Sequence, residues 1–256
     1  MKLEDAVKDY NFNREEFLQP GFLTVFVNLL EESTNETRYE ILTSILNYFD
    51  STAVHKAAFR GNVRVLKAMF RGFREIQIVT LVQQRNQGGF TALHYAAEEN
   101  HPNVINFLLA SLSPKQKIAT VEIDQEGFTA LHHAACHQQP EAICCLLRHV
   151  DIRQRLKLLR TPDKYGETAL HMAAEDGNVK VVSCILNSLT VSDKLWLMAA
   201  QNNFHETPYD AAVYTEQWKV VSLLDSHKSW AIDGSSLNPP RGKEFHCIII
   251  CYCIRK

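Results

Sequence analysis

Apolar residues recur along the chain in short groups with helical spacing. Val104–Leu108 and Val181–Leu186 each place apolar side chains three or four positions apart, which is the spacing of one face of a helix. Turn-forming segments rich in Asn, Asp and Gly separate these groups from shorter apolar segments upstream. The pattern predicts an all-α protein built from many short helices.

A heptapeptide precedes these groups and returns at a nearly constant distance. It reads "TALHYAA" from Thr91, "TALHHAA" from Thr129 and "TALHMAA" from Thr168, with related forms "TAVHKAA" from Thr52 and "TPYDAAV" from Thr207. The intervals are 39, 38, 39 and 39 residues. A constant period over five copies indicates one supersecondary unit stacked on itself rather than five chemical sites.

The motif resembles the Thr-Pro-Leu-His-x-Ala pattern of ankyrin repeats over roughly residues 47–230. The resemblance implies a solenoid of about five repeats, each with a hairpin-like turn and two antiparallel helices. The period exceeds the family's usual length of about 33 residues, and the surplus follows the second helix. Because apolar residues recur there at helical spacing, we expect an extra short helix in each repeat, capped near Ser113 and Ser192.

The motif residues have structural explanations. We expect each threonine to accept hydrogen bonds from the first backbone N–H groups of a helix, and each leucine to point into the core. The resemblance implies that each histidine forms a local hydrogen bond at the junction of loop and helix. Four bases in a row serve no single reaction, so we do not expect catalysis from them. This structural set comprises Thr91, Leu93, His94, Thr129, Leu131, His132, Thr168, Leu170 and His171.

A turn stands just before each motif. Gly89, Gly127 and Gly166 occupy a position where a hairpin-like tip needs a positive φ. His205 and Asp50 stand there in the outer copies, so we expect those two tips to be looser or differently shaped.

The sequence divides into four parts. Residues 1–46 look like an N-terminal cap with a degenerate half repeat, 47–230 form the array, and 231–243 are a linker rich in Gly, Ser and Pro. Residues 244–256 have the length and β-branched content of one strand. The order of residues before this tail distantly resembles the lead-in to caspase-like domains, so the tail is either a divergent end or the first strand of a truncated further domain.

Composition narrows the functional classes. A formal net charge of -2, with both signs spread along the chain, provides no basic stripe for nucleic acid. Apolar runs are shorter than the ~20 residues that a membrane helix needs. Seven cysteines, an odd number, and the lack of an apolar signal segment favour free thiols in a reducing compartment, the cytoplasm or the nucleus. We expect a monomer.

No pattern for catalysis, cofactor or metal emerges. The histidines and cysteines between His132 and His149 lack the C-x-x-C spacing of a zinc site, and half of them belong to the repeat motif. Neither a phosphate-binding loop nor a Gly-x-Ser-x-Gly elbow occurs in the sequence. We therefore expect a non-enzymatic scaffold or adaptor that binds a protein segment in a concave groove. The alternative is the recognition array of a larger signalling protein with a caspase-like or death domain.

The resemblance implies that partner contacts come from the turn tips and from the residues just after the first helix. Acidic residues outnumber Arg60 and Lys164 there, so we expect a partner segment with Lys or Arg whose binding weakens with salt. The aromatic tip residues are candidate anchors, although packing on the next tip would also explain them. The candidate partner-binding residues are Gln87, Phe90, Glu98, Glu99, Gln125, Glu126, Phe128, Cys136, His137, Lys164, Tyr165, Glu167, Glu175, Asp176, Asn203, Phe204, Glu206 and Tyr214.

Overall fold

The computed structural model describes residues 34–35, 42, 51–113, 116–117 and 123–228. Over these ranges the chain forms thirteen α-helices, and none is long and apolar enough to cross a membrane. Most of the expected N-terminal cap, the linker 231–243 and the apolar tail 244–256 lie outside the described residues. The prediction of an all-α repeat solenoid is confirmed.

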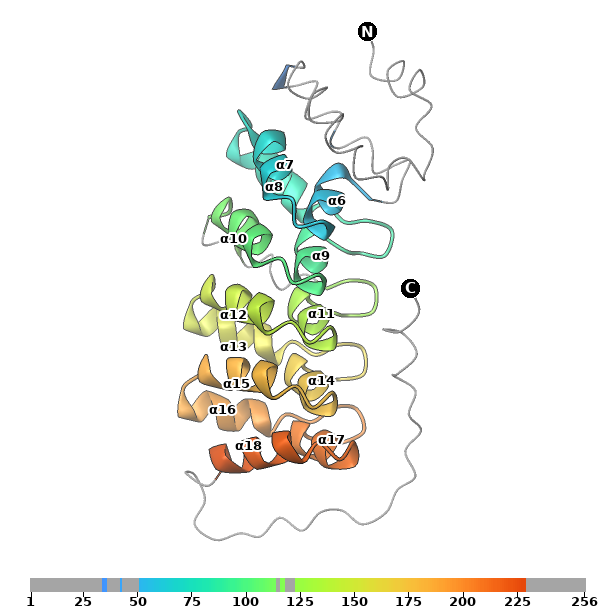
Figure 1. The fold of residues 1–256 in the computed structure, drawn as a ribbon, viewed down its shortest axis with the longest axis vertical. Coiled ribbons are helices and arrows are strands. Elements are labelled where there is room, and N and C mark those ends of the chain that lie inside the picture. The colour runs from blue at the N-terminus through green and yellow to red at the C-terminus, as the bar shows by residue number, and fades with distance from the viewer. Residues whose placement is uncertain (1–33, 36–41, 43–50, 114–115, 118–122, 229–256) are drawn as a thin grey trace.

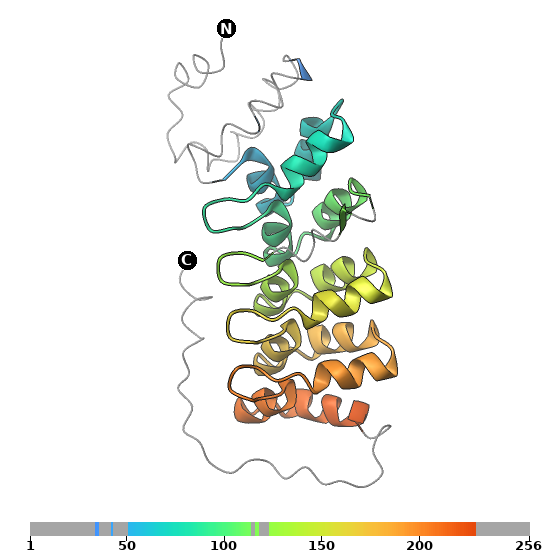
Figure 2. The same ribbon diagram turned by 180° about the vertical axis from the view of Figure 1, so that it is seen from behind.

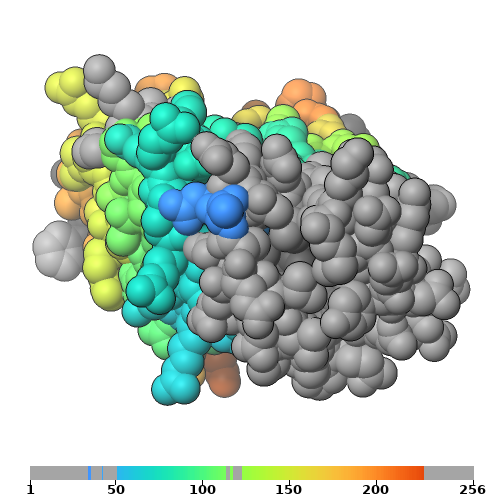
Figure 3. All heavy atoms as spheres, turned by 90° about the horizontal axis from the view of Figure 1, so that it is seen from above, coloured from blue at the N-terminus to red at the C-terminus, as the bar shows by residue number. Residues whose placement is uncertain are grey.

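The helices stack in columns along the long axis (Figure 1). In the view down this axis, the first repeat lies in front and the later repeats lie behind it (Figure 3). The first helices are α6 (Ala53–Phe59), α9 (Ala92–Glu98), α11 (Ala130–Cys136), α14 (Ala169–Glu175) and α17 (Pro208–Tyr214). The second helices are α7 (Val63–Phe70), α10 (Pro102–Ala110), α12 (Pro140–Arg148), α15 (Val179–Asn187) and α18 (Trp218–Lys228). Each first or second helix contacts its counterpart in the next repeat.

Three extra helices follow second helices, as the long period predicts: α8 (Glu75–Gln83), α13 (Ile152–Arg160) and α16 (Val191–Met198). The extra helix expected after Ser113 falls mostly on residues outside the described ranges. In the view from behind, α13 (yellow) and α16 (orange) lie on the near side of the stack (Figure 2). The cap of α16 lies two residues before the expected cap at Ser192. This cap is Thr190, because the Thr190 side chain accepts from the Asp193 N–H at 3.3 Å.

Small and branched apolar side chains form one core through the described repeats. Ala96 and Ala97 have no exposed surface, and their size lets adjacent first helices approach closely. Leu93, Leu131 and Leu170 are buried beside them. Since every repeat buries its faces against its neighbours, nearest-neighbour packing holds the array together.

The connection from first to second helix uses a left-handed residue in every described repeat. Asn100 has φ 53° and Gln138 has φ 56°. A left-handed conformation at a residue other than glycine costs about 1 kcal/mol. The φ value is also positive at Gly61, Gly177 and Glu216.

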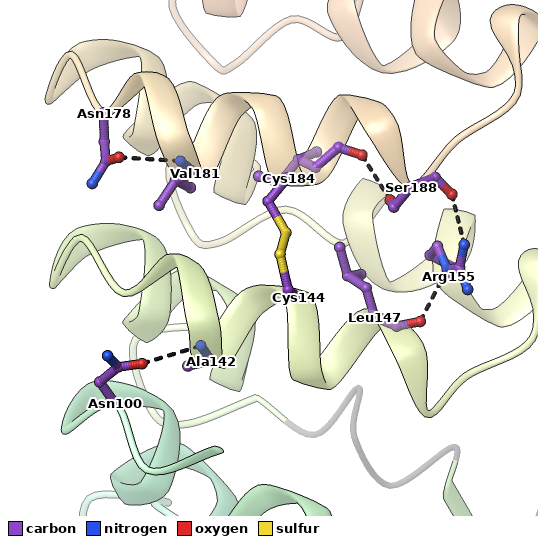
Figure 4. The surroundings of a disulfide bond; sticks show 10 residues. Asn100, Ala142, Cys144, Leu147, Arg155, Asn178, Val181, Cys184 and Ser188 are labelled. Atoms are coloured by element: carbon purple, nitrogen blue, oxygen red, sulfur yellow. Dashed lines mark hydrogen bonds between the residues drawn. A yellow bond between two sulfur atoms is a disulfide. The ribbon is translucent and has the colours of Figure 1, made fainter.

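Cys144 of α12 and Cys184 of α15 form a disulfide with a Cα–Cα distance of 6.0 Å (Figure 4). The two residues are 40 positions apart, about one repeat, so stacking brings them together. This corrects the expectation of free thiols throughout the chain, because a count of cysteines does not reveal which ones face each other. Within the described ranges, Cys136 and Cys145 carry reduced thiols.

The extra helix α13 is fastened to the second helices by one arginine (Figure 4). The Arg155 guanidinium donates to the carbonyl oxygens of Leu147 at 3.0 Å, Val150 at 3.4 Å and Ser188 at 2.7 Å. Carbonyls at the C-terminal ends of helices carry partial negative charge and lack intrahelical partners. The inner side of α13 is therefore anchored by Arg155 across two repeats.

Candidate functional site

Four hairpin-like tips precede α9, α11, α14 and α17 and project from the same side of the stack (Figures 1 and 2). In the tip before α11, the Asp124 N–H donates to the Phe128 carbonyl at 2.9 Å, and the Gly127 N–H donates to the Asp124 carbonyl at 3.2 Å. Asp124 Oδ1 also accepts from the Phe128 N–H at 2.8 Å. Equivalent bonds form around Asn86, Asp163 and Asn202.

Our sequence reasoning missed these Asn and Asp side chains. The signal was nevertheless present, because an Asn or Asp stands five residues before the threonine of each of the last four motifs. Such side chains accept from backbone N–H groups two to four residues ahead and so fix a turn without help from other elements.

The three glycine tips have the expected positive φ, at 81°, 85° and 79° for Gly89, Gly127 and Gly166. His205 has φ 62° at the equivalent position, and its N–H donates to the Asn202 carbonyl at 3.0 Å. The expectation of a differently shaped tip at His205 is therefore wrong, because the Asn202 side chain imposes the turn. Asp50 lies outside the described residues.

Adjacent tips are joined by backbone hydrogen bonds into one continuous edge. Each link joins the N–H of one tip to a carbonyl of the preceding tip: Gln125 to Gly88 at 3.1 Å, Lys164 to Glu126 at 3.4 Å and Asn203 to Tyr165 at 2.9 Å. We call this edge, with the exposed residues at the ends of the first helices, the tip face.

Each motif histidine joins two repeats, which extends the local role expected of it. His132 Nδ1 accepts from the Thr129 backbone N–H at 3.0 Å, and Nε2 lies 3.2 Å from the Glu167 carbonyl oxygen in the next tip. His94 and His171 make the equivalent contacts. In the last motif Asp210 replaces the histidine, and its carboxylate accepts from the Thr207 N–H at 2.9 Å.

These histidines are neutral. Burial lowers the pKa of His94 to about 3 and that of His132 and His171 to about 4. Because Nδ1 accepts from an N–H group, the single proton resides on Nε2 and is donated to the next tip. The geometry uses both ring nitrogens and leaves none for proton transfer.

The aromatic candidates fall into two classes. Phe90 and Phe128 directly precede a motif threonine and are half-buried, with ring centroids 4.7 Å and 5.5 Å from that of His133. Of the two explanations for the aromatic tip residues, packing fits these two rings, because this register position points at the first helix. Tyr165 and Phe204 lie two residues earlier in the tip, where Tyr165 is half-buried and Phe204 is 49% exposed.

A buried hydrogen-bonded pair, His133 and Asp124, fills the space behind these rings. His133 Nε2 lies 2.9 Å from Asp124 Oδ2. Burial raises the pKa of Asp124, but hydrogen bonds from His133 and the Phe128 N–H outweigh it and leave the pKa below its usual value. This aromatic and histidine cluster therefore serves packing between the second and third described repeats.

Glu167 was expected at the surface, but it is only 5% exposed because its position in the register faces the interior. Its Oε1 accepts from the Asn202 side chain at 3.4 Å, whereas Oε2 and the neighbouring Asp163 Oδ2 have no hydrogen-bond partner. Burial, and then the charges of Glu175 and Asp163, raise the pKa of Glu167 to about 7. This junction thus holds an excess of carboxylates.

The remaining candidates lie at or near the surface. Glu98 is 3.6 Å from His137 Nε2, and Lys164 pairs with Glu126. Half-buried candidates are Glu98, Glu126, Cys136, His137, Glu175 and Glu206. Exposed candidates are Arg60, Gln87, Glu99, Gln125, Lys164, Asp176, Asn203 and Tyr214. No three His, Cys, Asp or Glu residues are placed to hold a metal in the described part of the chain.

Comparisons with known proteins agree with this architecture. A model of three ankyrin repeats matches residues 21–119, and a single-repeat model matches residues 126–156 and 165–194. No curated protein matches the chain at a significant level. Ankyrin repeats are generally protein–protein interaction modules. Because these matches together cover more than half of the chain and the helices stack with the same period, the chain belongs to the ankyrin-repeat family.

Proposed function

We propose that this protein is a non-enzymatic scaffold whose tip face binds a basic segment of a partner protein. The observation that carries the proposal is the excess of carboxylates on this face. Among the described residues, the cations that pair there are Lys164 with Glu126 and, when protonated, His137 with Glu98.

Electrostatics favours a cationic partner. Burial raises the pKa of Glu175, and the charges of Asp176 and Glu206 raise it further. Carboxyls that repel one another are stabilised by an added positive charge, and lysine or arginine of a partner would supply it. Since the exposed members are solvated, we expect association to weaken as salt concentration rises.

Aromatic side chains add a second element of recognition. Phe204 is 49% exposed at the last tip, and Tyr214 is 51% exposed at the end of α17. Large aromatic residues dominate the energetics of many interfaces. We therefore place the centre of the interface on the last two repeats, where exposed rings lie near the carboxylate excess.

The test compares two charge reversals of equal size. Partners captured from lysate are quantified with the wild type, with Glu99→Lys/Asp176→Lys on the tip face, and with Glu75→Lys/Asp225→Lys elsewhere. All four residues are exposed. We expect the tip variant to lose a salt-sensitive partner that the control retains. Equal retention by both variants would refute the proposal.

The proposal extends to a monomer that acts inside the cell without binding nucleic acid or membrane. The odd number of cysteines supports an intracellular location, whereas the Cys144–Cys184 disulfide counts against it, because disulfides are rare in the cytosol. To decide whether the disulfide forms inside the cell, the thiols are blocked in intact cells and the protein is then analysed by non-reducing electrophoresis. Light scattering after size-exclusion chromatography tests whether the protein is a monomer.

A further inference from the structure

The outward side of α13 carries a row of exposed cations. Arg153, Lys157 and Arg160 follow one another at spacings of four and three residues, so they lie on one face of the helix. Together with Leu156, Thr161 and Pro162 they line an open depression. Over a rise of about 1.5 Å per residue, the three charges span about 10 Å.

These cations do not hold the fold together. No described carboxylate forms an ion pair with any of the three. The anchoring of α13 to the second helices is provided instead by Arg155 on the inner side. The equivalent positions of the other two described extra helices are uncharged: Ile76, Thr80 and Gln83 in α8, and Ser192, Trp196 and the C-cap Ala199 of α16. Among the three described extra helices, the cationic row is therefore particular to α13.

An exposed tryptophan lies beside the row. Trp196 of α16 is 65% exposed, and the Arg160 guanidinium carbon lies 5.2 Å from its ring centroid. The helices α13 and α16 are in contact (Figure 2). Because this indole is so accessible, its burial within the chain contributes little to stability. Tryptophan and arginine are among the residues most enriched at the centres of interfaces.

We propose that Arg153, Lys157, Arg160 and Trp196, here called the α13–α16 face, form a second docking surface for an acidic protein segment with an apolar side chain. Partner carboxylates would pair with the three cations, and the apolar side chain would cover Trp196 and the depression beside Leu156. This surface lies on different helices from the tip face and has the opposite charge, so the proposal does not depend on the proposed function.

The extent of the face favours a peptide over nucleic acid. Proteins that track a phosphate backbone typically make about six to ten contacts, whereas this face offers three cations. The carboxylates of Asp151 and Asp193, at the starts of α13 and α16, limit the positive region further. A short acidic peptide matches the length and charge of the row.

The experiment selects short random peptides, displayed on phage, against the full chain and in parallel against Arg153→Glu/Lys157→Glu. We expect peptides enriched only by the wild type to carry Asp or Glu beside an apolar residue. A fluorescent form of the most enriched peptide should lose about tenfold or more in affinity for the variant. Trp196→Ala should weaken binding several-fold.

The matched control is Arg64→Glu/Lys67→Glu, which reverses two exposed cations on α7 and should leave affinity within about twofold. Arg153→Gln/Lys157→Gln removes the charges without reversing them and answers the same question if the first variant alters the circular dichroism spectrum. The proposal is overturned by equal enrichment on wild type and variant, by equal loss in the control, or by a single-stranded oligonucleotide that binds this face more tightly than the peptide.

Discussion

The tip framework, meaning the buried threonines and histidines of the repeat motif behind the tip face, and the α13–α16 face follow opposite rules of residue usage. In the tip framework, equivalent positions carry the same residue types, and the histidine side chains are buried in hydrogen bonds between repeats, as His132 is. At the helix position that Lys157 occupies on the α13–α16 face, the three described extra helices carry Thr80, Lys157 and Trp196, all exposed. The difference teaches that recurrence along the array marks what holds repeats together, while divergence marks what each repeat can recognise.

Acidification should affect the tip framework most strongly. The pKa values of His94, His132 and His171 are lower in the folded state, so their contribution to stability is complete above pH 6.5 and is lost as pH falls. Between about pH 7 and about pH 5, each histidine should lower the free energy of unfolding by about 2 kcal/mol. Folding raises the pKa of Glu167, so protonation of this carboxyl should offset about 2 kcal/mol of the loss from the three histidines. The net loss in the free energy of unfolding should be about 4 kcal/mol.

Urea unfolding at the two pH values measures this loss, and amide exchange shows where it occurs. Protection should fall first at the tips and last in α13, which contains no histidine. Stability that is unchanged or higher near pH 5 would contradict the buried neutral histidines.

Single substitutions in the tip framework and on the α13–α16 face should lower the free energy of unfolding by different amounts. His132→Ala removes the partners of the Thr129 N–H and the Glu167 carbonyl, and should lower the free energy of unfolding by about 3 kcal/mol. Lys157→Ala removes an exposed, unpaired cation and should change it by less than about 0.5 kcal/mol. Equal effects in urea unfolding would remove the distinction between the structural tip framework and the α13–α16 face.

Glu167→Gln should stabilise the protein at high pH. A carboxyl whose pKa is raised by folding contributes stability at low pH and loses it as pH rises through about 7. We expect a gain of about 2 kcal/mol near pH 8 and none near pH 5, measured by urea unfolding. The same variant should weaken the binding of a basic partner to the tip face without changing the affinity of an acidic peptide for the α13–α16 face.

The smallest expected effect concerns the shape of the last tip. His205→Gly removes the strain of φ 62° and should raise the free energy of unfolding by about 0.5 kcal/mol. Gly166→Ala at the equivalent position should lower it, because a Cβ there would lie 2.8 Å from the Asn203 backbone nitrogen. Thermal unfolding of both variants checks the opposite signs.

The fold could be predicted because one signal was repeated five times. Threonine, leucine and histidine recur at fixed spacing, and each copy confirmed the others. The extra helices were equally visible from the constant surplus, although the start of α16 was misplaced because Thr190 competes with Ser192 as a cap.

The candidate site could be predicted less well, because residues within one tip differ in burial according to register. Phe90 and Phe204 look alike in sequence, but only the second is at a turn position that points outward. Glu167 was likewise expected at the surface, because the sequence does not show that its position in the tip faces the interior. The cationic row of α13 went unnoticed because nothing in the repeat pattern singles out a position that varies, and the row becomes visible only when Trp196 is placed beside Arg160.

The Cys144–Cys184 bond closes a segment of chain that contains part of each face. The loop that it closes contains the three cations of α13 and the tip that carries Glu167. When the ends of the array are pulled apart, this loop of 40 residues cannot extend in the oxidised protein. About 14 nm of contour length would stay hidden until reduction releases it, at about 3.5 Å per residue. Mechanical load and oxidation thus act on a stretch that contributes part of each proposed binding surface.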